Sequence, residues 1–246
     1  MTYGISEKTF LEGLTYGVQR TTKLIYGATE FHGDAVRTEY MLTADIAREF
    51  MERHLEVKVE CLNRHLLNAI TALKNTAKKR KKILGNKRTD VALVRSILPV
   101  GMVELKIGVR KLTGVKKDLT KIAKTMSLLK PQYAAKVIGA AVFQIHLATT
   151  RSRHKKQHFV SAMKKIENRL EADLRIYRRS QPDFTFTLHP LNAANEGFVE
   201  AEIERDEDGS LMVGRPGHVT RYYSILVRST RPVPPLALDE LRQLTA

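Results

Sequence analysis

Residues 89–108 decide the fold of this chain, and they read Thr-Asp-Val-Ala-Leu-Val-Arg-Ser-Ile-Leu-Pro-Val-Gly-Met-Val-Glu-Leu-Lys-Ile-Gly. Two apolar runs flank a short turn around Pro99, a pattern that predicts two adjacent strands. Side chains alternate between the two faces of a strand. Asp90 therefore shares a face of the first strand with its apolar neighbours, while Glu104 and Lys106 share a face of the second.

Charged side chains inside such apolar strands are costly unless something compensates them. If the strands pair so that Asp90 lies near Glu104, the two carboxylates repel each other and one pKa rises unless a cation lies between them. Mg²⁺, with Mn²⁺ as a substitute, fits this need, because Mg²⁺ usually takes one or two carboxylates together with waters and substrate phosphate. A neighbouring lysine such as Lys106 can orient or deprotonate a water, or offset charge on a phosphate.

The flanking sequence alternates between helical and strand periodicity. Apolar spacing predicts helices over 6–25, 38–54, 116–129 and about 152–179. Strands are expected over 56–62, 89–95, 101–108, 140–148, 184–188, 198–203 and 219–227, with a turn at Asp208-Gly209 between the last two. A short helix is expected after Pro235, and residues 78–86 are expected to form a loop. The chain is interpreted as one α/β domain over 1–246.

Asp90, followed after thirteen residues by Glu104-Leu105-Lys106 on an adjacent strand, resembles the PD-(D/E)xK nuclease superfamily. The family core runs helix, three strands, helix, strand, and the elements expected over about 38–150 follow that order. The resemblance implies a restriction-endonuclease-like core, an αβββαβ mixed sheet flanked by helices. The long helix and a β-rich C-terminal extension would occupy about 151–246. Thr89 stands where many members have proline.

The resemblance also implies an activity, the Mg²⁺-dependent hydrolysis of DNA phosphodiester bonds. The protein would be an endonuclease in restriction, phage defence or mobile-element processing. Asp90 and Glu104 would hold the metal, the backbone carbonyl of Leu105 would be a further ligand, and Lys106 would position the nucleophilic water. Glu39 occupies the place of a first-helix glutamate that reaches the metal shell in many members. Small nucleases of this kind often act as homodimers, and the C-terminal region is a candidate interface.

The charge of the chain indicates a polyanionic partner. The 246 residues include 42 Lys and Arg against 26 Asp and Glu, a net charge of +16, whereas the segment 196–208 is acidic. Two basic stretches supply the candidate nucleic-acid contacts: Lys78, Lys79, Arg80, Lys81, Lys82, Lys87, Arg88, Arg151, Arg153, Lys155 and Lys156. DNA is the expected partner and RNA is not excluded. The alternative is a basic nucleic-acid-binding protein without activity, and the absence of Trp argues against base stacking on RNA.

Other polar residues have two interpretations each. Asp118 and Lys121 could line the site, but a solvated helix face is the favoured interpretation. Gln144 and His146 are expected to be a hydrogen-bonded buried pair rather than part of a cleft. Glu60 could approach the cleft from its strand, although this is the less favoured interpretation.

Several classes of protein find no support in the sequence. The single cysteine, Cys61, excludes an intrachain disulfide and argues against a cysteine-based zinc site. No glycine-rich phosphate loop and no His-Glu-x-x-His motif is present. No apolar run approaches the roughly 20 residues of a transmembrane helix, and the first residues lack the layout of a signal peptide. A cytoplasmic protein without a membrane partner is expected.

Overall fold

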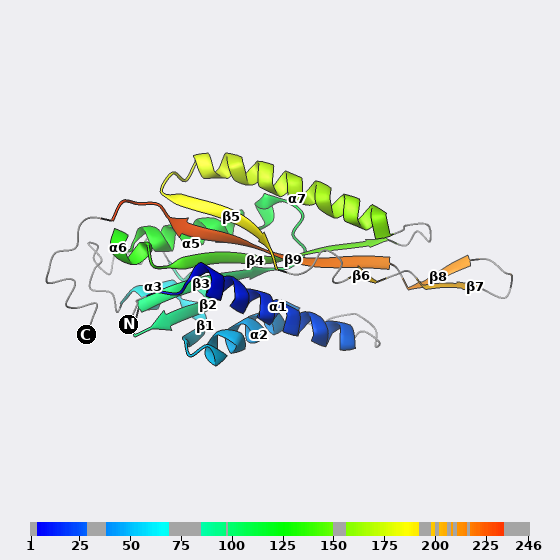
Figure 1. Cartoon of the computed structure of the whole chain (residues 1–246), viewed down its shortest axis with the longest axis horizontal. Coiled ribbons are helices and arrows are strands. Elements are labelled where there is room, and N and C mark those ends of the chain that lie inside the picture. The colour runs from blue at the N-terminus through cyan, green and yellow to red at the C-terminus, as the bar shows by residue number, and fades with distance from the viewer. Residues whose placement is uncertain are drawn as a thin grey trace.

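The computed structural model describes residues 4–28, 38–68, 85–96, 98–149, 156–191, 198–199, 202–205, 208, 211–215 and 217–233. These residues form a mixed β-sheet with helices on both faces (Figure 1). The helices are α1 (Glu7–Ala28), α2 (Thr38–Glu52), α3 (Asn63–Asn68), the 3₁₀ turn η1 (Leu112–Gly114), α5 (Lys116–Ser127), α6 (Pro131–Ala134) and α7 (Lys156–Arg179). The strands are β1 (Glu56–Leu62), β2 (Arg88–Arg95), β3 (Leu98–Lys106), β4 (Ile138–Thr149), β5 (Phe184–Pro190), β6 (Phe198–Val199), β7 (Glu202–Arg205), β8 (Leu211–Arg215) and β9 (Gly217–Ser229).

The main sheet has seven strands, six of them in the order β1-β2-β3-β4-β9-β5, and β6 pairs with β9. β3 and β4 are parallel, and the other neighbouring strands are antiparallel. β7 and β8 form a separate two-stranded sheet. The expected α/β class with a mixed sheet flanked by helices is therefore confirmed.

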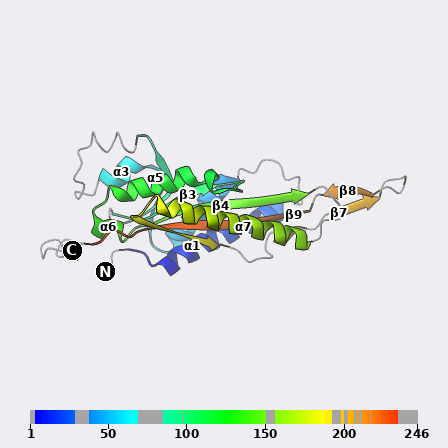
Figure 2. The ribbon, with the colours of Figure 1, turned by 90° about the horizontal axis from the view of Figure 1, so that it is seen from above.

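The two faces of the sheet bury different side chains, as strand alternation requires. Val91, Leu93 and Val103 pack with the apolar stripes of α1 and α2. Met102, Ala141 and Phe143 pack on the opposite side with α5 and α7, and Figure 2 shows these two helices from above. Glu104 and Lys106 alternate in step with Met102, so the charged positions of β3 belong to the side that α5 covers.

The C-terminal strands were expected to form an extension, and this is wrong for β5, β6 and β9, which join the main sheet. β9 pairs with β4 from Gly139↔Val227 to Thr149↔Gly217 and lies between β4 and β5 inside the main sheet. β9 is buried along most of its length, and its apolar sequence satisfies cores on both faces. Helix α1, which was left outside the expected core, likewise packs in the layer of α2.

Most expected elements are present, with errors in the C-terminal part. The region 198–203 forms two short strands instead of one, and β8 was missed. The residue Asp208 therefore lies between β7 and β8, and not directly before β9. The expected loop at 78–86 falls outside the described residues except for a turn at 85–86, and the helix expected after Pro235 falls outside them entirely. Among the helices that the structure describes, none combines the length and apolar character needed to cross a bilayer.

Helices α1 and α2 approach each other closely at glycines. A Cβ added to Gly17 would lie 2.8 Å from Ile46 Cα, and one added to Gly13 would lie 2.5 Å from the Phe50 ring. The neighbour of Gly17 is backbone, so a change of side-chain rotamer cannot relieve the overlap. This contact fixes the position of α2, whose first turn contains Glu39.

We predict that Gly17→Ala destabilises the protein by about 1–3 kcal/mol, because the added methyl group overpacks the helix contact. Chemical denaturation followed by circular dichroism measures this difference. Gly114→Ala is the control, since its Cβ would lie at an ordinary 3.4 Å from Val109. A Gly17→Ala protein as stable as the Gly114→Ala protein would contradict the close packing of α1 on α2.

Candidate functional site

The strand register places three acids in one row across the sheet. Val59 pairs with Val91 and Cys61 with Thr89, so Glu60 stands opposite Asp90. Val91 pairs with Val103, and one step further along both strands Asp90 stands opposite Glu104. The convergence of Asp90 and Glu104 that the sequence predicts is therefore present in the backbone of β2 and β3.

Asp90 connects the two strands where their ladder ends. Beyond the pair Val91↔Val103, the Leu105 N–H donates to Asp90 Oδ2 at 2.7 Å. Burial raises the pKa of Asp90, and this hydrogen bond, Lys121 and Lys106 oppose the rise. Leu105 thus contacts the site through its backbone N–H, which binds Asp90. The metal-ligand role of its carbonyl stays a prediction.

Glu104 is the most deeply buried acid of the row. Its side chain is 2 % exposed, and its Oε2 atom forms an ion pair with Lys121 Nζ. Its other oxygen, Oε1, is buried without a hydrogen-bond partner. Burial raises the pKa of Glu104 to about 8 even though the Lys121 ammonium opposes the rise. Burial raises the pKa of Glu104 and the Lys121 ammonium lowers it, and burial has the larger effect. One ammonium therefore does not offset the cost of burying the charged carboxylate.

A buried chain of hydroxyl and amide groups holds α5 beside this row. Thr89 Oγ1 donates to Asn63 Oδ1 at 2.8 Å, and Asn63 Nδ2 donates to Thr125 Oγ1 at 3.0 Å. Thr125 is on α5, one turn after Lys121, and its hydroxyl donates to the Lys121 carbonyl at 2.8 Å. Lys121 Nζ also donates to the Arg88 carbonyl at 2.7 Å. The helix is therefore attached to β2 directly through Lys121 and, through Asn63, by Thr125.

Two further carboxyls and a second lysine complete the cluster. Burial raises the pKa of Glu39, with Lys106 opposing the rise and the acids of the cluster adding to it. Burial likewise raises the pKa of Asp118 on α5, against Lys121 and Lys106. Lys106 itself is exposed at the end of β3. Lys106 thus lies within electrostatic reach of Glu39, Asp90 and Asp118, and Asp90 lies within reach of Glu39 and Glu104.

The favoured interpretation of Lys121 as part of a solvated helix face is wrong. Its side chain is 17 % exposed and pairs with Glu104. Helical spacing alone could not show this, because Lys121 lies on the polar side of α5 and that side faces a row of acids. Glu60, held with a φ of +50° beside Asp90, also lies closer to the site than the favoured interpretation had it.

The expected pair Gln144 and His146 is hydrogen-bonded but only partly buried. Gln144 Nε2 donates to the Tyr222 hydroxyl at 3.1 Å, and His146 Nδ1 bonds with Thr220 Oγ1 at 2.9 Å. Gln144 is half-buried and His146 is exposed. Both side chains are thus hydrogen-bonded to residues of β9.

Most of the predicted basic contacts lie outside the described residues: Lys78, Lys79, Arg80, Lys81, Lys82, Arg151, Arg153 and Lys155. Lys87, Arg88 and Lys156 are described and exposed. Arg88 immediately precedes the row of acids, and its carbonyl accepts from Lys121. One of the two basic stretches therefore ends at the site.

The donor set suits a hard divalent cation. The orphaned Oε1 of Glu104 is a buried acceptor without a donor, and Asp90 stands opposite it in the register. Two carboxylates are the usual protein contribution to a Mg²⁺ site. Within the described ranges, no group of three or more His, Cys, Asp or Glu side chains is arranged to hold a metal. Asp90 and Glu104 are the two carboxyls that could contribute to such a site.

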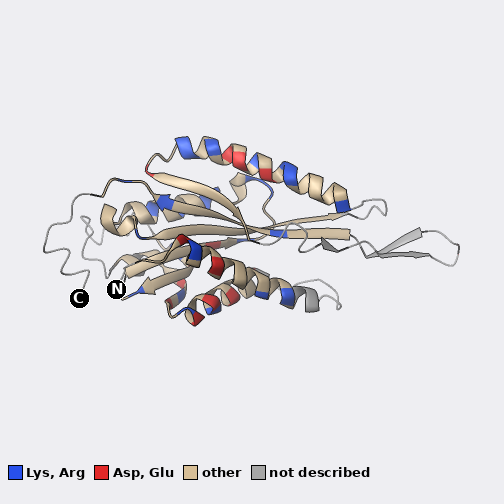
Figure 3. Ribbon diagram, viewed as in Figure 1, with Lys and Arg blue, Asp and Glu red and all other residues tan. Residues whose placement is uncertain are grey.

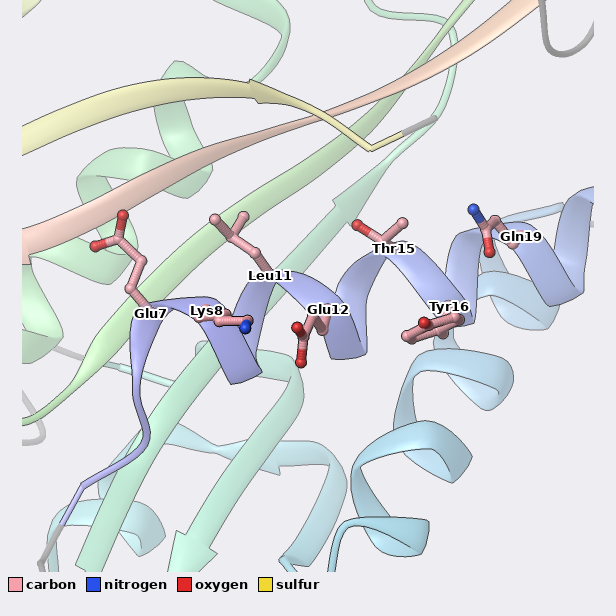
Figure 4. A pocket seen from close by; sticks show the side chains of 7 residues that line it. All are labelled: Glu7, Lys8, Leu11, Glu12, Thr15, Tyr16 and Gln19. Carbon is pink, nitrogen blue, oxygen red and sulfur yellow. The ribbon is translucent and has the colours of Figure 1, made fainter. Parts of the chain in front are cut away.

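A separate hollow of about 540 Å³ lies along α1 (Figure 4). It is lined by Glu7, Lys8, Leu11, Glu12, Thr15, Tyr16 and Gln19. None of these residues belongs to the acidic row, and the hollow is open and formed by one helix. We therefore place the candidate chemistry at the row of acids and not in this hollow.

Comparisons with known proteins add no relative: the chain matches no family model, no curated protein and no solved structure. A fold by itself does not establish an activity. Function must therefore be argued from the chemistry of the row formed by Glu60, Asp90 and Glu104 and from the helices that face it.

We predict that Glu104→Gln stabilises the protein at high pH in buffer without divalent ions. The folded-state pKa of about 8 lies above the ordinary glutamate value of 4.5, so the native state binds the extra proton between these pH values. Wild-type stability then falls as pH rises from about 5 to 8, whereas Gln carries no such proton. The two proteins should be equally stable near pH 5 and differ by roughly 3–5 kcal/mol near pH 9.

Urea denaturation at a series of pH values, with a chelator present, measures this difference. Glu171→Gln on the exposed face of α7 is the control substitution and should give a constant offset. A difference between wild type and Glu104→Gln that does not change with pH would contradict the burial of Glu104.

We predict that Glu60→Gly stabilises the protein by about 1 kcal/mol, because a non-glycine residue in the left-handed region carries a penalty of roughly that size. Glu60 has a φ of +50° in the middle of β1. Lys58→Gly on the same strand is the control, and it should destabilise because glycine weakens an ordinary strand position. Thermal unfolding of both variants tests the strain, and equal losses of stability would argue against it.

Proposed function

We propose that this protein is a Mg²⁺-dependent nuclease of the PD-(D/E)xK type that hydrolyses phosphodiester bonds in DNA. One observation carries the proposal: Asp90 and Glu104 face each other on adjacent strands, and the buried Glu104 retains an oxygen without a partner. Burying carboxylates without compensation destabilises a fold. Such an arrangement is typical of a site that acts on a ligand.

The element order supports a restriction-endonuclease-like core as part of this proposal. Along the chain, α2 is followed by β1, β2 and β3, then by α5 and β4, with the short α3 between β1 and β2, η1 before α5 and α6 before β4. This is the helix, three strands, helix, strand order of the family. The acids and Lys106 fall on β2 and β3, and Glu39 falls in the first turn of α2.

Each residue has a chemical role in this proposal. Asp90 and Glu104 would hold the Mg²⁺ ion, with Glu39 reaching the same cluster from α2. The ion, with Mn²⁺ as a substitute, supplies Lewis acidity at the scissile phosphate and lowers the pKa of a bound water. Lys106, exposed beside the acids, would position the attacking water and offset charge on the phosphate. The backbone at Leu105 keeps Asp90 in place through its N–H.

The basic surface near the site would hold the nucleic acid by its phosphates. Helices α5 and α7 both cover the sheet face to which Glu104 belongs. Figure 3 shows Lys and Arg at several turns of α7. The exposed basic residues of these two helices are Lys116, Lys117, Lys124, Lys156, Lys164, Lys165, Arg169, Arg175, Arg178 and Arg179. DNA is the proposed substrate and RNA is the alternative. A homodimer and a role in restriction, phage defence or mobile-element processing belong to the same proposal.

A second candidate is a nucleic-acid-binding protein that keeps this fold without activity. The pairing of Glu104 with Lys121 favours it, because the lysine already neutralises part of the acidic row. The two candidates differ in one property, which is whether removing an acid abolishes a reaction or strengthens binding to a polyanion.

We predict that the wild-type protein nicks or linearises plasmid DNA with Mg²⁺ and does nothing in EDTA. Asp90→Asn, Glu104→Gln and Lys106→Met should each lower the rate at least about 100-fold, because Asp90 and Glu104 would hold the ion and Lys106 would position the attacking water. Lys8→Met removes an exposed lysine of α1, which packs on the opposite face of the sheet, and is the control, with nearly wild-type cleavage expected.

Binding of a DNA duplex, measured in Ca²⁺ at several salt concentrations, separates the two candidates. A nuclease should retain salt-sensitive binding in the Asp90→Asn protein while losing cleavage. Cleavage at the wild-type rate in all three variants would contradict the assignment. Binding without any cleavage by wild type would favour the second candidate.

A further inference from the structure

Lys121 brings a positive charge into contact with the acidic row. Its ammonium pairs with Glu104 Oε2 and donates to the Arg88 carbonyl at 2.7 Å. Its charge also acts on Asp90 and Asp118, the two other acids that flank Glu104. The lysine of the family resemblance, Lys106, is exposed instead and is not the one that pairs with Glu104.

A divalent ion and this ammonium would compete for one carboxylate. Glu104 is 2 % exposed, so charges bound to it are poorly screened by water and like charges repel strongly. The free Oε1 atom gives an incoming ion a first contact. Once the ion is bound there, the ammonium on the neighbouring oxygen is destabilised.

We propose that Lys121 is the resident cation of the metal-free protein and leaves Glu104 when a divalent ion binds. This inference rests on the proposed function, because it needs an ion at Asp90 and Glu104. In the ion-loaded protein Lys121 no longer holds α5 against Glu104. Its ammonium then contacts solvent or Asp118.

The surroundings of Lys121 allow this exchange without movement of the helix. The hydrogen bonds from Thr89 through Asn63 to Thr125 hold α5 by uncharged groups that the ion does not replace. Asp118 lies one turn before Lys121 on the same helix, and the Lys121 charge already lowers the pKa of Asp118 against the effect of burial. The Lys121 side chain is 17 % exposed, so a change of rotamer brings it to the surface.

The opposite view treats the Lys121–Glu104 pair as a permanent structural ion pair. A permanent pair would keep Lys121 protected whether or not an ion is present. Under the exchange, by contrast, the Lys121 amine is protected without a divalent ion and becomes exposed when the ion binds. The chemical reactivity of the Lys121 amine therefore separates the two views, and it does not depend on catalysis.

The experiment measures the acylation rate of each lysine in the full-length protein with an isotope-coded N-hydroxysuccinimide ester and peptide mass spectrometry. In EDTA we expect Lys121 to react more slowly than Lys117 and Lys124, which are exposed on the same helix. Saturating Mg²⁺ should raise the Lys121 rate several-fold and leave the two control lysines unchanged. NaCl at equal ionic strength should have no such effect.

Glu104→Gln is the matched variant, and circular dichroism checks that it folds. Its Lys121 should react quickly in EDTA and should not respond to Mg²⁺. Calorimetric titration with Mg²⁺ establishes ion binding independently. Ion binding to wild type with Lys121 still protected would overturn the exchange and leave the proposed nuclease intact. No ion binding to wild type would overturn both the exchange and the metal-dependent function.

Discussion

The buried Glu104 carboxylate is the constraint on which the rest of the site depends. Strand alternation fixes it on the face that α5 covers. The register of β2 and β3, extended one step beyond the pair Val91↔Val103, puts Asp90 opposite it. Burial alone would favour the neutral form of the carboxyl group, and the ion pair with Lys121 of α5 opposes this effect. Since that lysine leaves one oxygen unsatisfied, the site retains a capacity for further positive charge.

The convergence of the acids could be predicted because it depends on local features. A short turn and two alternating strands determine which side chains of β2 and β3 share a face. The helix that carries Glu39 was also predictable, since apolar spacing over 38–52 matches α2. The fold class followed from the same periodicities. These features need only neighbours in the sequence or a single hairpin.

The misses share a different physical origin, which is pairing between distant segments. Residues 219–227 read as a strand, but the local pattern does not say that β9 would lie between β4 and β5. Lys121 lies on the polar side of α5, and this position predicts exposure to solvent. The polarity of a helix side does not show which element that side faces. The partner of Lys121, Glu104, is on a different element and is recognised only once the helix is docked through Asn63 and Thr125.

Several unfavourable features fall in one row of the sheet, and this concentration is an argument for function. Glu60 adopts a left-handed backbone conformation within β1, and Asp90 and Glu104 both have pKa values raised by burial. A sequence shaped by stability alone would place Ala or Val at such positions, as it does at Ala92 and Val94 two and four residues beyond Asp90. Conflicts between local preference and global fold are expected where a protein retains them for chemistry. The packing of the sheet alone therefore does not account for the acids of this row.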